Sequence, residues 1–433
     1  MNTMERLLIR ELEKWKKKKN RRPLLLTGAR CTGKTRVMKD FAAKNFTRTV
    51  YIDFENDTRL HDLLERTSEP KQIISALSLI CKEKITPEDS LIIFDEIREE
   101  PGAMEALKHF CDKAPEYTVI AADSYPENMA DKGKDVTAGK LDRLTLYPMS
   151  FREFLCATGR QTLYEILNSG EPYSICAMKT FFEEELRLYY TVGGMPAVVQ
   201  EYVDHEDLLR CRKKQEEILD LYRQDIAKHA PASLLPRVYQ VWDAIPGQLS
   251  EDNRKFIFGH IEKGTRARSY EAAIRWLSDS GLIYRVHRVK QPGASLKTNV
   301  IPSSFKLYLH DTGLLGAMGA LEPESIIDDG RLFGGLGGAI NEQYVVQQLV
   351  SDMGIDAYYY SSANSRGEID LLIRRGDGAV PIEVRAEENL KAKSLRAFMQ
   401  KYDVKKGVRI SLSDYREQDR FVNLPLYAFM ALL

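Results

Sequence analysis

The residues with the clearest chemical potential form a short loop that contains two glycines. The stretch 28–35 reads GARCTGKT and fits the pattern G-x-x-x-x-G-K-[ST] without a mismatch. Such a loop points successive backbone N–H groups at a phosphate, and its glycines allow a close approach that a Cβ would block. Its lysine would reach the β- and γ-phosphates, and its last hydroxyl would ligate Mg²⁺. The residues expected to bind a nucleoside triphosphate are Gly28, Ala29, Arg30, Cys31, Thr32, Gly33, Lys34 and Thr35.

Two consecutive carboxylates end an apolar stretch farther along the chain. Residues 90–96 read SLIIFDE, with Asp95 and Glu96 at the end of the run. This pattern is typical of the strand that completes a magnesium site next to a phosphate-binding loop. Asp95 would hold the shell of the Mg²⁺ bound by Thr35, and Glu96 would orient or deprotonate the attacking water. The alternative is a solvated strand end.

Ser124 ends the next apolar stretch, 117–124. A polar residue in this position can sense the γ-phosphate, so Asp123 or Ser124 could do so, and Ser124 is a candidate ATP-binding residue. The other interpretation is a side chain that caps a loop.

Alternating strands and helices must position these side chains. Apolar runs typical of buried strands occur at 24–26, 49–54, 90–95, 117–124 and 141–146. Helical patterns separate them. The sequence therefore predicts an α/β domain with a parallel sheet through residue 150.

Composition sets wider limits on the 433-residue chain. Its 63 basic and 63 acidic residues give no net charge that would indicate nucleic acid. Its six cysteines form no C-x-x-C pair and are typical of reduced thiols. There is no apolar run long enough to cross a membrane and no signal-peptide pattern, so we expect a cytoplasmic protein with no membrane partner.

The second half of the chain has a different organisation. Residues 160–230 are helical in pattern, apart from the break Gly193-Gly194-Met195-Pro196. Residues 234–310 predict two helices followed by a hairpin, which is the order of a winged helix that could contact DNA or a protein. The glycine-rich stretch 334–338 predicts a hinge.

Several motifs together resemble a prokaryotic AAA-type P-loop ATPase family whose members carry a C-terminal domain of uncharacterised function. They are GARCTGKT, LIIFDEI, PGAMEALKHFCDKAPEYTVIAADS, LTLYPMSFREFL and YYTVGGMPAVV. The resemblance runs over nearly the whole chain. It implies an AAA-like P-loop core at 1–158, a helical lid at 159–232, a winged-helix-like domain at 233–333, and an α/β restriction-endonuclease-like domain at 334–433.

The resemblance also implies an active site shared between subunits. Many AAA domains complete their active site with an arginine from a neighbouring subunit, and Arg143 is the candidate by position. An ordinary surface arginine is the alternative. A homo-oligomer is therefore one expected assembly.

Four C-terminal residues resemble the E…D…E-x-K site of restriction-endonuclease-like nucleases. Glu342, Asp370 and Glu383 would form a second metal site, and Arg385 stands in the place of the lysine. Arginine can stabilise charge but cannot release a proton. The alternatives are an active nuclease and a nuclease-like fold kept for docking.

These patterns lead to two functional hypotheses. The first is a Mg-dependent ATPase, with ATP and Mg²⁺ as cofactors, that acts as a switch or motor coupled to double-stranded DNA through its C-terminal domains. The second is an ATP-gated signalling scaffold that binds a protein partner and contains an inactive nuclease-like domain.

Overall fold

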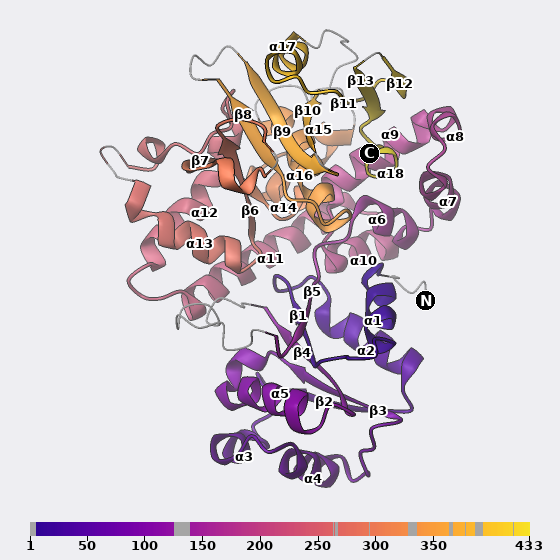
Figure 1. Ribbon diagram of the computed structural model, residues 1–433, viewed down its shortest axis with the longest axis vertical. Helices are drawn as coiled ribbons and strands as arrows, with labels where there is room; N and C mark the ends of the chain where they lie inside the picture. The colour runs from indigo at the N-terminus through magenta and orange to yellow at the C-terminus, as the bar shows by residue number, and fades with distance from the viewer. Residues whose placement is uncertain are drawn as a thin grey trace. The chain divides into compact units, whose positions relative to one another are not determined.

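The computed structural model describes residues 6–124, 139–262, 264, 267–293, 295–327, 336–362, 367–376, 378–385, 393–418 and 420–433. It contains two compact units. The N-terminal unit runs to Tyr147 and includes Asp279–Gly281, and the C-terminal unit comprises Pro148–Ser278 and Leu282–Leu433. Each unit has its own sheet (Figure 1).

The sheet of the N-terminal unit is parallel, with the strand order β2-β3-β4-β1-β5. Register pairs Thr27 with Asp123 and Asp53 with Asp95, so polar strand ends meet at one edge of the sheet. This confirms the predicted α/β fold with a parallel sheet. The strands are β1 (Leu24–Thr27), β2 (Arg48–Asp53), β3 (Ser90–Asp95), β4 (Thr118–Asp123) and β5 (Asp142–Thr145).

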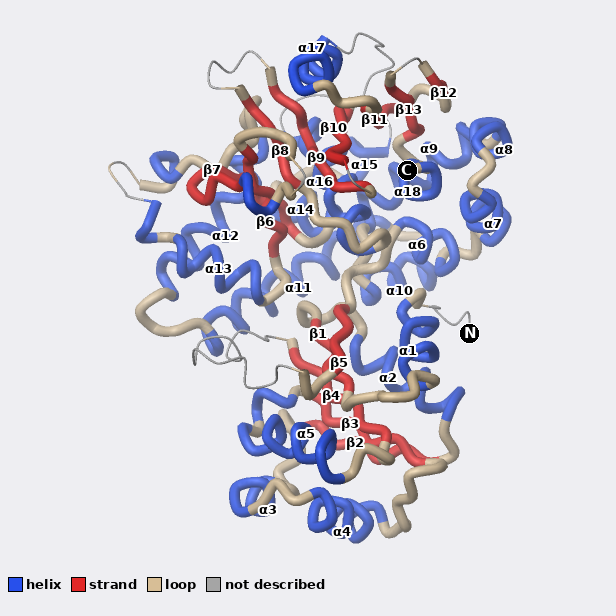
Figure 2. The backbone as a smooth tube through the Cα atoms, viewed as in Figure 1, coloured by secondary structure: helices blue, strands red, loops and turns tan. Residues whose placement is uncertain are grey.

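Helices cover both faces of this sheet because its strands are apolar on both sides. Ile93 on β3 packs in the same cluster as residues of α1 and α2, whereas its neighbours Ile92 and Phe94 pack in the cluster formed by α3, α4 and α5. Figure 2 shows the strands of this unit with helices around them. The helices are α1 (Leu8–Lys16), α2 (Lys34–Asn45), α3 (His61–Arg66), α4 (Pro70–Cys81) and α5 (Pro101–Lys113).

The C-terminal unit has an eight-stranded mixed sheet in the order β12-β13-β11-β10-β9-β8-β6-β7. Strands β10, β11 and β13 are parallel, and the hairpin of β6 and β7 joins β8 through a parallel pairing of β6. The strands are β6 (Ile283–Val289), β7 (Val300–Leu309), β8 (Tyr358–Ser361), β9 (Glu368–Arg375), β10 (Gly378–Val384), β11 (Gly407–Ser411), β12 (Arg416–Glu417) and β13 (Phe421–Pro425).

This sheet crosses the boundary that the sequence places between residues 333 and 334. The predicted hairpin exists, and it also forms one end of the C-terminal sheet. The hairpin joins this sheet because the side of β6 that faces away from β7 has backbone groups that pair with β8. The division into four domains stays a prediction, beside the two compact units of the structure.

The remaining helices lie after residue 147. Ser150 begins α6 with a reciprocal capping box to Glu153. The predicted hinge at 334–338 is wrong in its second half, because α16 begins at Leu336; residues 334 and 335 lie outside the described residues. The helices are α6 (Phe151–Ala157), α7 (Gln161–Ser169), α8 (Pro172–Ala177), α9 (Lys179–Val192), α10 (Pro196–His205), α11 (Leu208–His229), α12 (Leu235–Ser250), α13 (Glu271–Asp279), α14 (Thr312–Met318), α15 (Pro323–Ile327), α16 (Leu336–Ser351), α17 (Lys393–Tyr402) and α18 (Phe429–Leu432).

The break at Gly193-Gly194 is a tight turn between α9 and α10. The carbonyl of Gly194 accepts from the N–H of Met149 at 2.6 Å, and its N–H donates to Asp311 at 2.6 Å. A Cβ on Gly194 would lie 2.2 Å from the Met149 oxygen. The glycine pair thus permits a close backbone approach inside the C-terminal unit.

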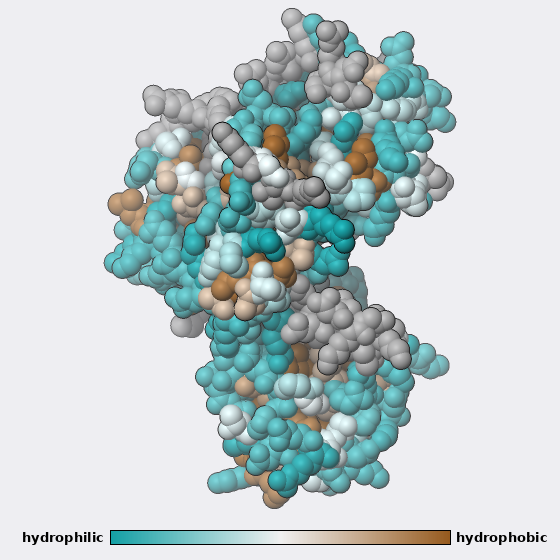
Figure 3. Space-filling view, turned by 90° about the vertical axis from the view of Figure 1, so that its left-hand side faces the viewer, coloured by the Kyte–Doolittle hydropathy of each residue, from teal (hydrophilic) through white to brown (hydrophobic). Residues whose placement is uncertain are grey.

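The surface is mainly polar on the face drawn in Figure 3, where hydrophobic residues form only small patches. Among the helices that the structure describes, none combines the length and apolar character needed to span a membrane.

Candidate nucleotide site and C-terminal carboxylate cluster

The predicted phosphate loop connects β1 to α2. Gly33 caps α2 with a φ of 95°, and Gly28 has a φ of 148°. A Cβ on Gly28 would lie 2.1 Å from the carbonyl oxygen of Leu146. Gly28 is therefore required by the neighbouring backbone as well as by any phosphate in the loop.

Lys34 is the first residue of α2, and its ammonium lies inside the loop. The Nζ atom donates to the carbonyls of Gly28 at 2.9 Å and Ala29 at 3.1 Å, and to the Ser124 Oγ at 2.8 Å. Burial lowers the pKa of Lys34, while the carboxylates of Glu96 and Asp95 oppose that shift. The loop thus holds a buried cation among oxygen acceptors.

Thr35 and Asp95 contact each other directly. The Thr35 hydroxyl donates to Asp95 Oδ2 at 2.6 Å, and the Tyr51 hydroxyl donates to the same oxygen at 2.9 Å. Burial and the charge of Asp95 raise the pKa of Tyr51, so its hydroxyl keeps its proton. These contacts fix an oxygen-rich corner where strands β2 and β3 end.

Glu96 follows β3 in a left-handed conformation with a φ of 47°. Its carboxylate accepts from the Ser124 hydroxyl at 2.7 Å. Burial raises the pKa of Glu96, and Lys34 opposes this effect. Since Ser124 also accepts from Lys34, it links the predicted base to the predicted phosphate-binding lysine.

The other loop residues have supporting contacts. The Thr32 hydroxyl donates to the Ala29 carbonyl at 2.8 Å, and Arg30 pairs with Glu55 at 3.3 Å. Cys31 adopts a φ of 65°. Arg6 donates to the carbonyl of Thr32 at 2.8 Å.

Sequence reasoning missed Arg6 and Tyr51. Arg6 also donates to the Tyr147 carbonyl at 2.6 Å, so it ties the loop to the end of this unit. No local signal marks Arg6. Tyr51 has a weak one, because it lies two residues before Asp53 on the strand that neighbours Asp95.

Arg143 lies on β5, the edge strand of the sheet, with an exposed side chain. A role for it in a neighbouring subunit stays a prediction.

The C-terminal carboxylates are enclosed by cations. Glu342 on α16 is fully buried, and it accepts from Lys306 at 2.8 Å and pairs with Arg254. Tyr308 donates to the same carboxylate. Burial alone would raise the pKa of Glu342, but Lys306 and Arg254 outweigh it, and the pKa falls below its ordinary value.

Asp370 and Glu383 have a second set of partners. Asp370 accepts from the N–H of Val384 at 2.8 Å. Arg385 donates to Glu383 at 2.9 Å and lies 3.9 Å from Asp370, and Arg409 donates to Glu383 at 3.4 Å. Burial, together with the charge of Glu342, raises the pKa of Asp370 to about 6.

The second metal site at these residues stays a prediction. Within the described ranges, no group of three or more His, Cys, Asp or Glu side chains is placed to hold a metal ion. Lysine and arginine side chains form ion pairs with Glu342 and Glu383 in this structure. The sequence missed Lys306 and Arg254 because both lie far along the chain from Glu342.

The family comparisons divide the chain into three parts. Residues 20–155 match the family model described as an AAA domain. This part of the chain is therefore similar to AAA domains. Residues 183–325 and 337–429 match two models that are each described as a domain of unknown function. No curated protein matches the chain.

Several solved structures resemble the chain at low identity. The Walker-type ATPase paby2304 of Pyrococcus abyssi is 14% identical with a TM-score of 0.44, over 72% of this chain and 94% of that one. The Orc1 protein of Aeropyrum pernix in complex with DNA is 11% identical with a TM-score of 0.29, over 72% and 91%. Cdc6p from Pyrobaculum aerophilum is 12% identical with a TM-score of 0.23, over 71% and 87%.

Proposed function

We propose that the chain binds Mg·ATP in the loop 28–35 and hydrolyses it. The observation that supports this best is the hydrogen-bond chain from Lys34 through Ser124 to Glu96. It connects a phosphate-binding cation to a buried carboxylate at the end of β3. The Lys34 ammonium already donates to carbonyl oxygens in the loop. It could donate to phosphate oxygens in their place without a large change of position.

The donor set fits a magnesium ion. Thr35 and Asp95 supply oxygen atoms, which hard divalent cations prefer, and their contact of 2.6 Å places both at one point. In the proposed reaction, Glu96 accepts a proton from the water that attacks the γ-phosphorus, and the bond to the β-phosphate oxygen breaks. Lys34 and the bound Mg²⁺ would stabilise the charge that develops on the phosphate oxygens.

We further propose that hydrolysis is coupled to double-stranded DNA through the C-terminal unit. The support is the predicted winged-helix order of α12, α13 and the β6–β7 hairpin. Cleavage of DNA is not part of this proposal, because cations neutralise the carboxylates that would hold the catalytic metal.

A second candidate function is an ATP-gated scaffold that binds a protein partner. The same ion-pair cluster favours it, since a nuclease-like domain without a metal site would be kept for docking. In either case Arg143 is the proposed residue that one subunit offers to its neighbour in a homo-oligomer.

Hydrolysis of Mg·ATP by the full chain, with and without a short DNA duplex, tests the first function. Glu96→Gln is the informative variant, and Glu88→Gln is its control because Glu88 is an exposed glutamate on the same unit. We expect duplex to stimulate phosphate release in the wild type and in Glu88→Gln but not in Glu96→Gln. The stimulation should weaken at higher salt because phosphate contacts release counterions.

The alternatives give different results. Hydrolysis that Glu96→Gln removes but that DNA never changes would favour the protein-partner scaffold. Hydrolysis that Glu96→Gln leaves intact would contradict the assigned base. Binding of ATP without any hydrolysis would contradict the proposed ATPase and leave a nucleotide-gated switch.

A further inference from the structure

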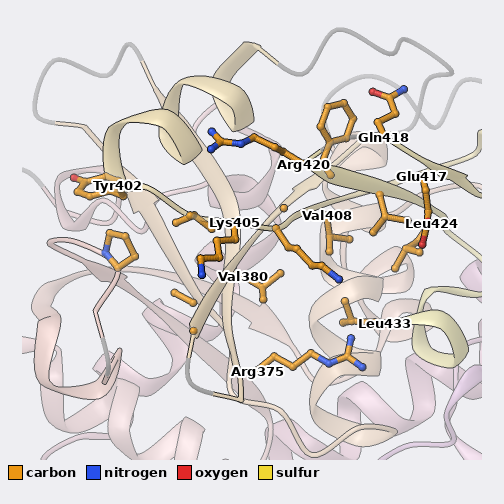
Figure 4. A pocket seen from close by; sticks show the side chains of 18 of the residues that line it. Arg375, Val380, Tyr402, Lys405, Val408, Glu417, Gln418, Arg420, Leu424 and Leu433 are labelled. Carbon is orange, nitrogen blue, oxygen red and sulfur yellow. The ribbon is translucent and has the colours of Figure 1, made fainter.

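The C-terminal unit contains a cavity of about 800 Å³ that the nucleotide site does not use. It lies where the three parallel strands of the sheet begin, since Gly378, Gly407 and Phe421 are the first residues of β10, β11 and β13 and all line it. Its volume is in the range of pockets that hold small ligands. Figure 4 shows side chains from these strands and the neighbouring loops around it.

Among the residues that the structure describes, the rim of the cavity carries more positive than negative charge. Four exposed cations line it, namely Arg375, Lys405, Lys406 and Arg420, against the two carboxylates of Asp403 and Glu417. Glu417 already accepts from the Tyr415 hydroxyl at 2.7 Å. Within the part of the chain that the structure describes, none of the four cations forms an ion pair with a carboxylate.

The floor of the cavity is apolar. Val380, Val408, Leu424 and Leu433 line it, and the last three are buried. Two half-buried tyrosines, Tyr402 and Tyr415, add ring surface. A ligand that fits both regions has an apolar or aromatic body and more than one negative charge.

We propose that this cavity binds a nucleoside phosphate unit, either a free nucleotide or one nucleotide of a single strand. The base would rest on the apolar floor and the tyrosine rings, and the phosphates would meet the lysines and arginines of the rim. Arginine's planar fork matches phosphate geometry, and aromatic rings and guanidinium planes stack on bases. An acidic peptide would use the charges but would leave the aromatic surface without a matching partner.

This site is separate from the carboxylate cluster on the same sheet. Gly378 at the cavity is the first residue of β10, whereas Glu383 lies near the other end of that strand. The free-nucleotide form of the proposal is independent of the proposed DNA coupling. The single-strand form is separate from it as well, because that coupling is to a duplex and this cavity would take an unpaired nucleotide.

Binding measurements on the full chain can test the site. We would use a Lys34→Ala background, which silences the phosphate loop, and two probes: a fluorescein-labelled oligothymidylate and thymidine 3′,5′-bisphosphate. The site variant is Lys405→Gln/Lys406→Gln. The control is Lys82→Gln/Lys84→Gln, which removes the same charge from exposed lysines outside the cavity.

We expect the site variant to weaken binding of at least one probe by tenfold or more, with the control unchanged. Weaker binding of the bisphosphate by the site variant identifies a free nucleotide as the ligand. Weaker binding of the oligonucleotide alone identifies a single strand. No binding of either probe, or equal binding by both variants, overturns the proposal. Capture of a labelled hexaglutamate peptide in place of both probes overturns it as well.

The same variants separate this proposal from the ATPase. In the Lys34 wild-type background, Lys405→Gln/Lys406→Gln should hydrolyse Mg·ATP at the basal wild-type rate, because neither lysine belongs to the nucleotide loop. Loss of probe binding with intact hydrolysis supports the cavity as a second site. Intact probe binding in a chain that hydrolyses no ATP would reject only the ATPase.

Discussion

At the scale of single residues, Ser124 has two partners whose charges are opposite. It accepts from Lys34 and donates to Glu96, so one hydroxyl sets the orientation of both. This arrangement explains why a serine at the end of β4 can matter to hydrolysis without contacting the attacking water. The hydroxyl also stabilises the ionised form of Glu96 and so lowers its pKa.

Ser124→Ala should shift the pH dependence of hydrolysis. Loss of the hydroxyl removes a donor that lowers the pKa of Glu96, whose burial already raises it. Because the base acts when deprotonated, the acidic limb of the kcat/KM profile should move to higher pH by roughly one unit. Ser124→Thr, which keeps a hydroxyl, should follow the wild type. An acidic limb that stays in place in Ser124→Ala would contradict this role.

Gly28→Ala should destabilise the N-terminal unit strongly. The added Cβ would lie 2.1 Å from the Leu146 carbonyl oxygen, in a backbone conformation with a φ of 148°. Strain of this kind costs about 1–3 kcal/mol, and the backbone clash adds to it. Thermal unfolding of the variant measures the loss.

Gly139→Ala is the matched control for this substitution. Gly139 also has a positive φ of 75°, but no atom of the described residues lies within 4 Å of its added Cβ. We expect a loss of only about 1 kcal/mol. Equal losses in the two variants would show that the approach of residue 146 is unimportant.

At this scale a local motif specifies the candidate nucleotide site. Lys34, Thr35, Asp95, Glu96 and Ser124 all follow from loop and strand-end patterns, and the structure brings them together. Arg6 and Tyr51 could not be predicted in the same way. Their contacts depend on which helix and strand pack beside the loop, and local spacing does not encode that.

At the scale of elements, α16 carries a charge that neighbouring strands must neutralise. Glu342→Gln should destabilise the C-terminal unit, because Lys306 and Arg254 would remain beside a neutral side chain. Removal of one partner from a buried ion pair costs about 3–5 kcal/mol. Chemical denaturation of the variant measures this loss.

A double variant provides the control for this prediction. Glu342→Gln/Lys306→Met should recover part of the lost stability. Lys306 is only 1% exposed, and its replacement removes a buried charge that Glu342 no longer neutralises. Strictly additive losses would contradict the coupling. Added Mg²⁺ should stabilise neither variant nor the wild type at this cluster.

His310, which follows β7, should make stability depend on pH. Burial lowers its pKa to about 4, so it is neutral in the folded protein. The contribution of neutral His310 to the free energy of unfolding is fully present above the unfolded pKa of about 6.5. It is lost as the pH falls toward 4, because the unfolded chain binds a proton that the folded chain does not. The full loss is on the order of 3 kcal/mol.

His310→Gln should flatten that dependence. Between pH 7 and pH 5, the free energy of unfolding measured by denaturation should fall less in His310→Gln than in the wild type. His260→Gln is the control because His260 is exposed, and it should behave as the wild type does. A wild-type slope in His310→Gln would contradict the assignment.

Elements were easier to predict than their pairing. The hairpin of β6 and β7 follows from apolar runs and a polar loop. Its parallel pairing with β8, residue 287 beside 358, joins segments that are far apart in sequence. The glycine content of 334–338 predicts a hinge, whereas α16 begins at Leu336 and includes Gly337 and Gly338. Composition alone does not reveal that a helix can begin with these residues.

At the scale of the whole molecule, the candidate nucleotide site and the cation-lined cavity belong to different units. The proposed coupling would therefore have to act between parts with separate sheets. Isolated fragments would not test this, so the experiments on DNA stimulation and on the cavity both use the full chain. Sequence patterns predict each unit's chemistry better than its partner, because partner recognition depends on surfaces that no local motif marks.

Phosphate release by Glu96→Gln, measured beside ATP binding on the same sample, tests most directly whether this chain is an ATPase with Glu96 as its base. We expect Mg·ATP affinity within about threefold of the wild type, because Lys34 and Thr35 remain in place. Phosphate release should fall by at least about 100-fold. Wild-type hydrolysis by Glu96→Gln, or failure of the wild-type chain to bind Mg·ATP, would contradict the central claim.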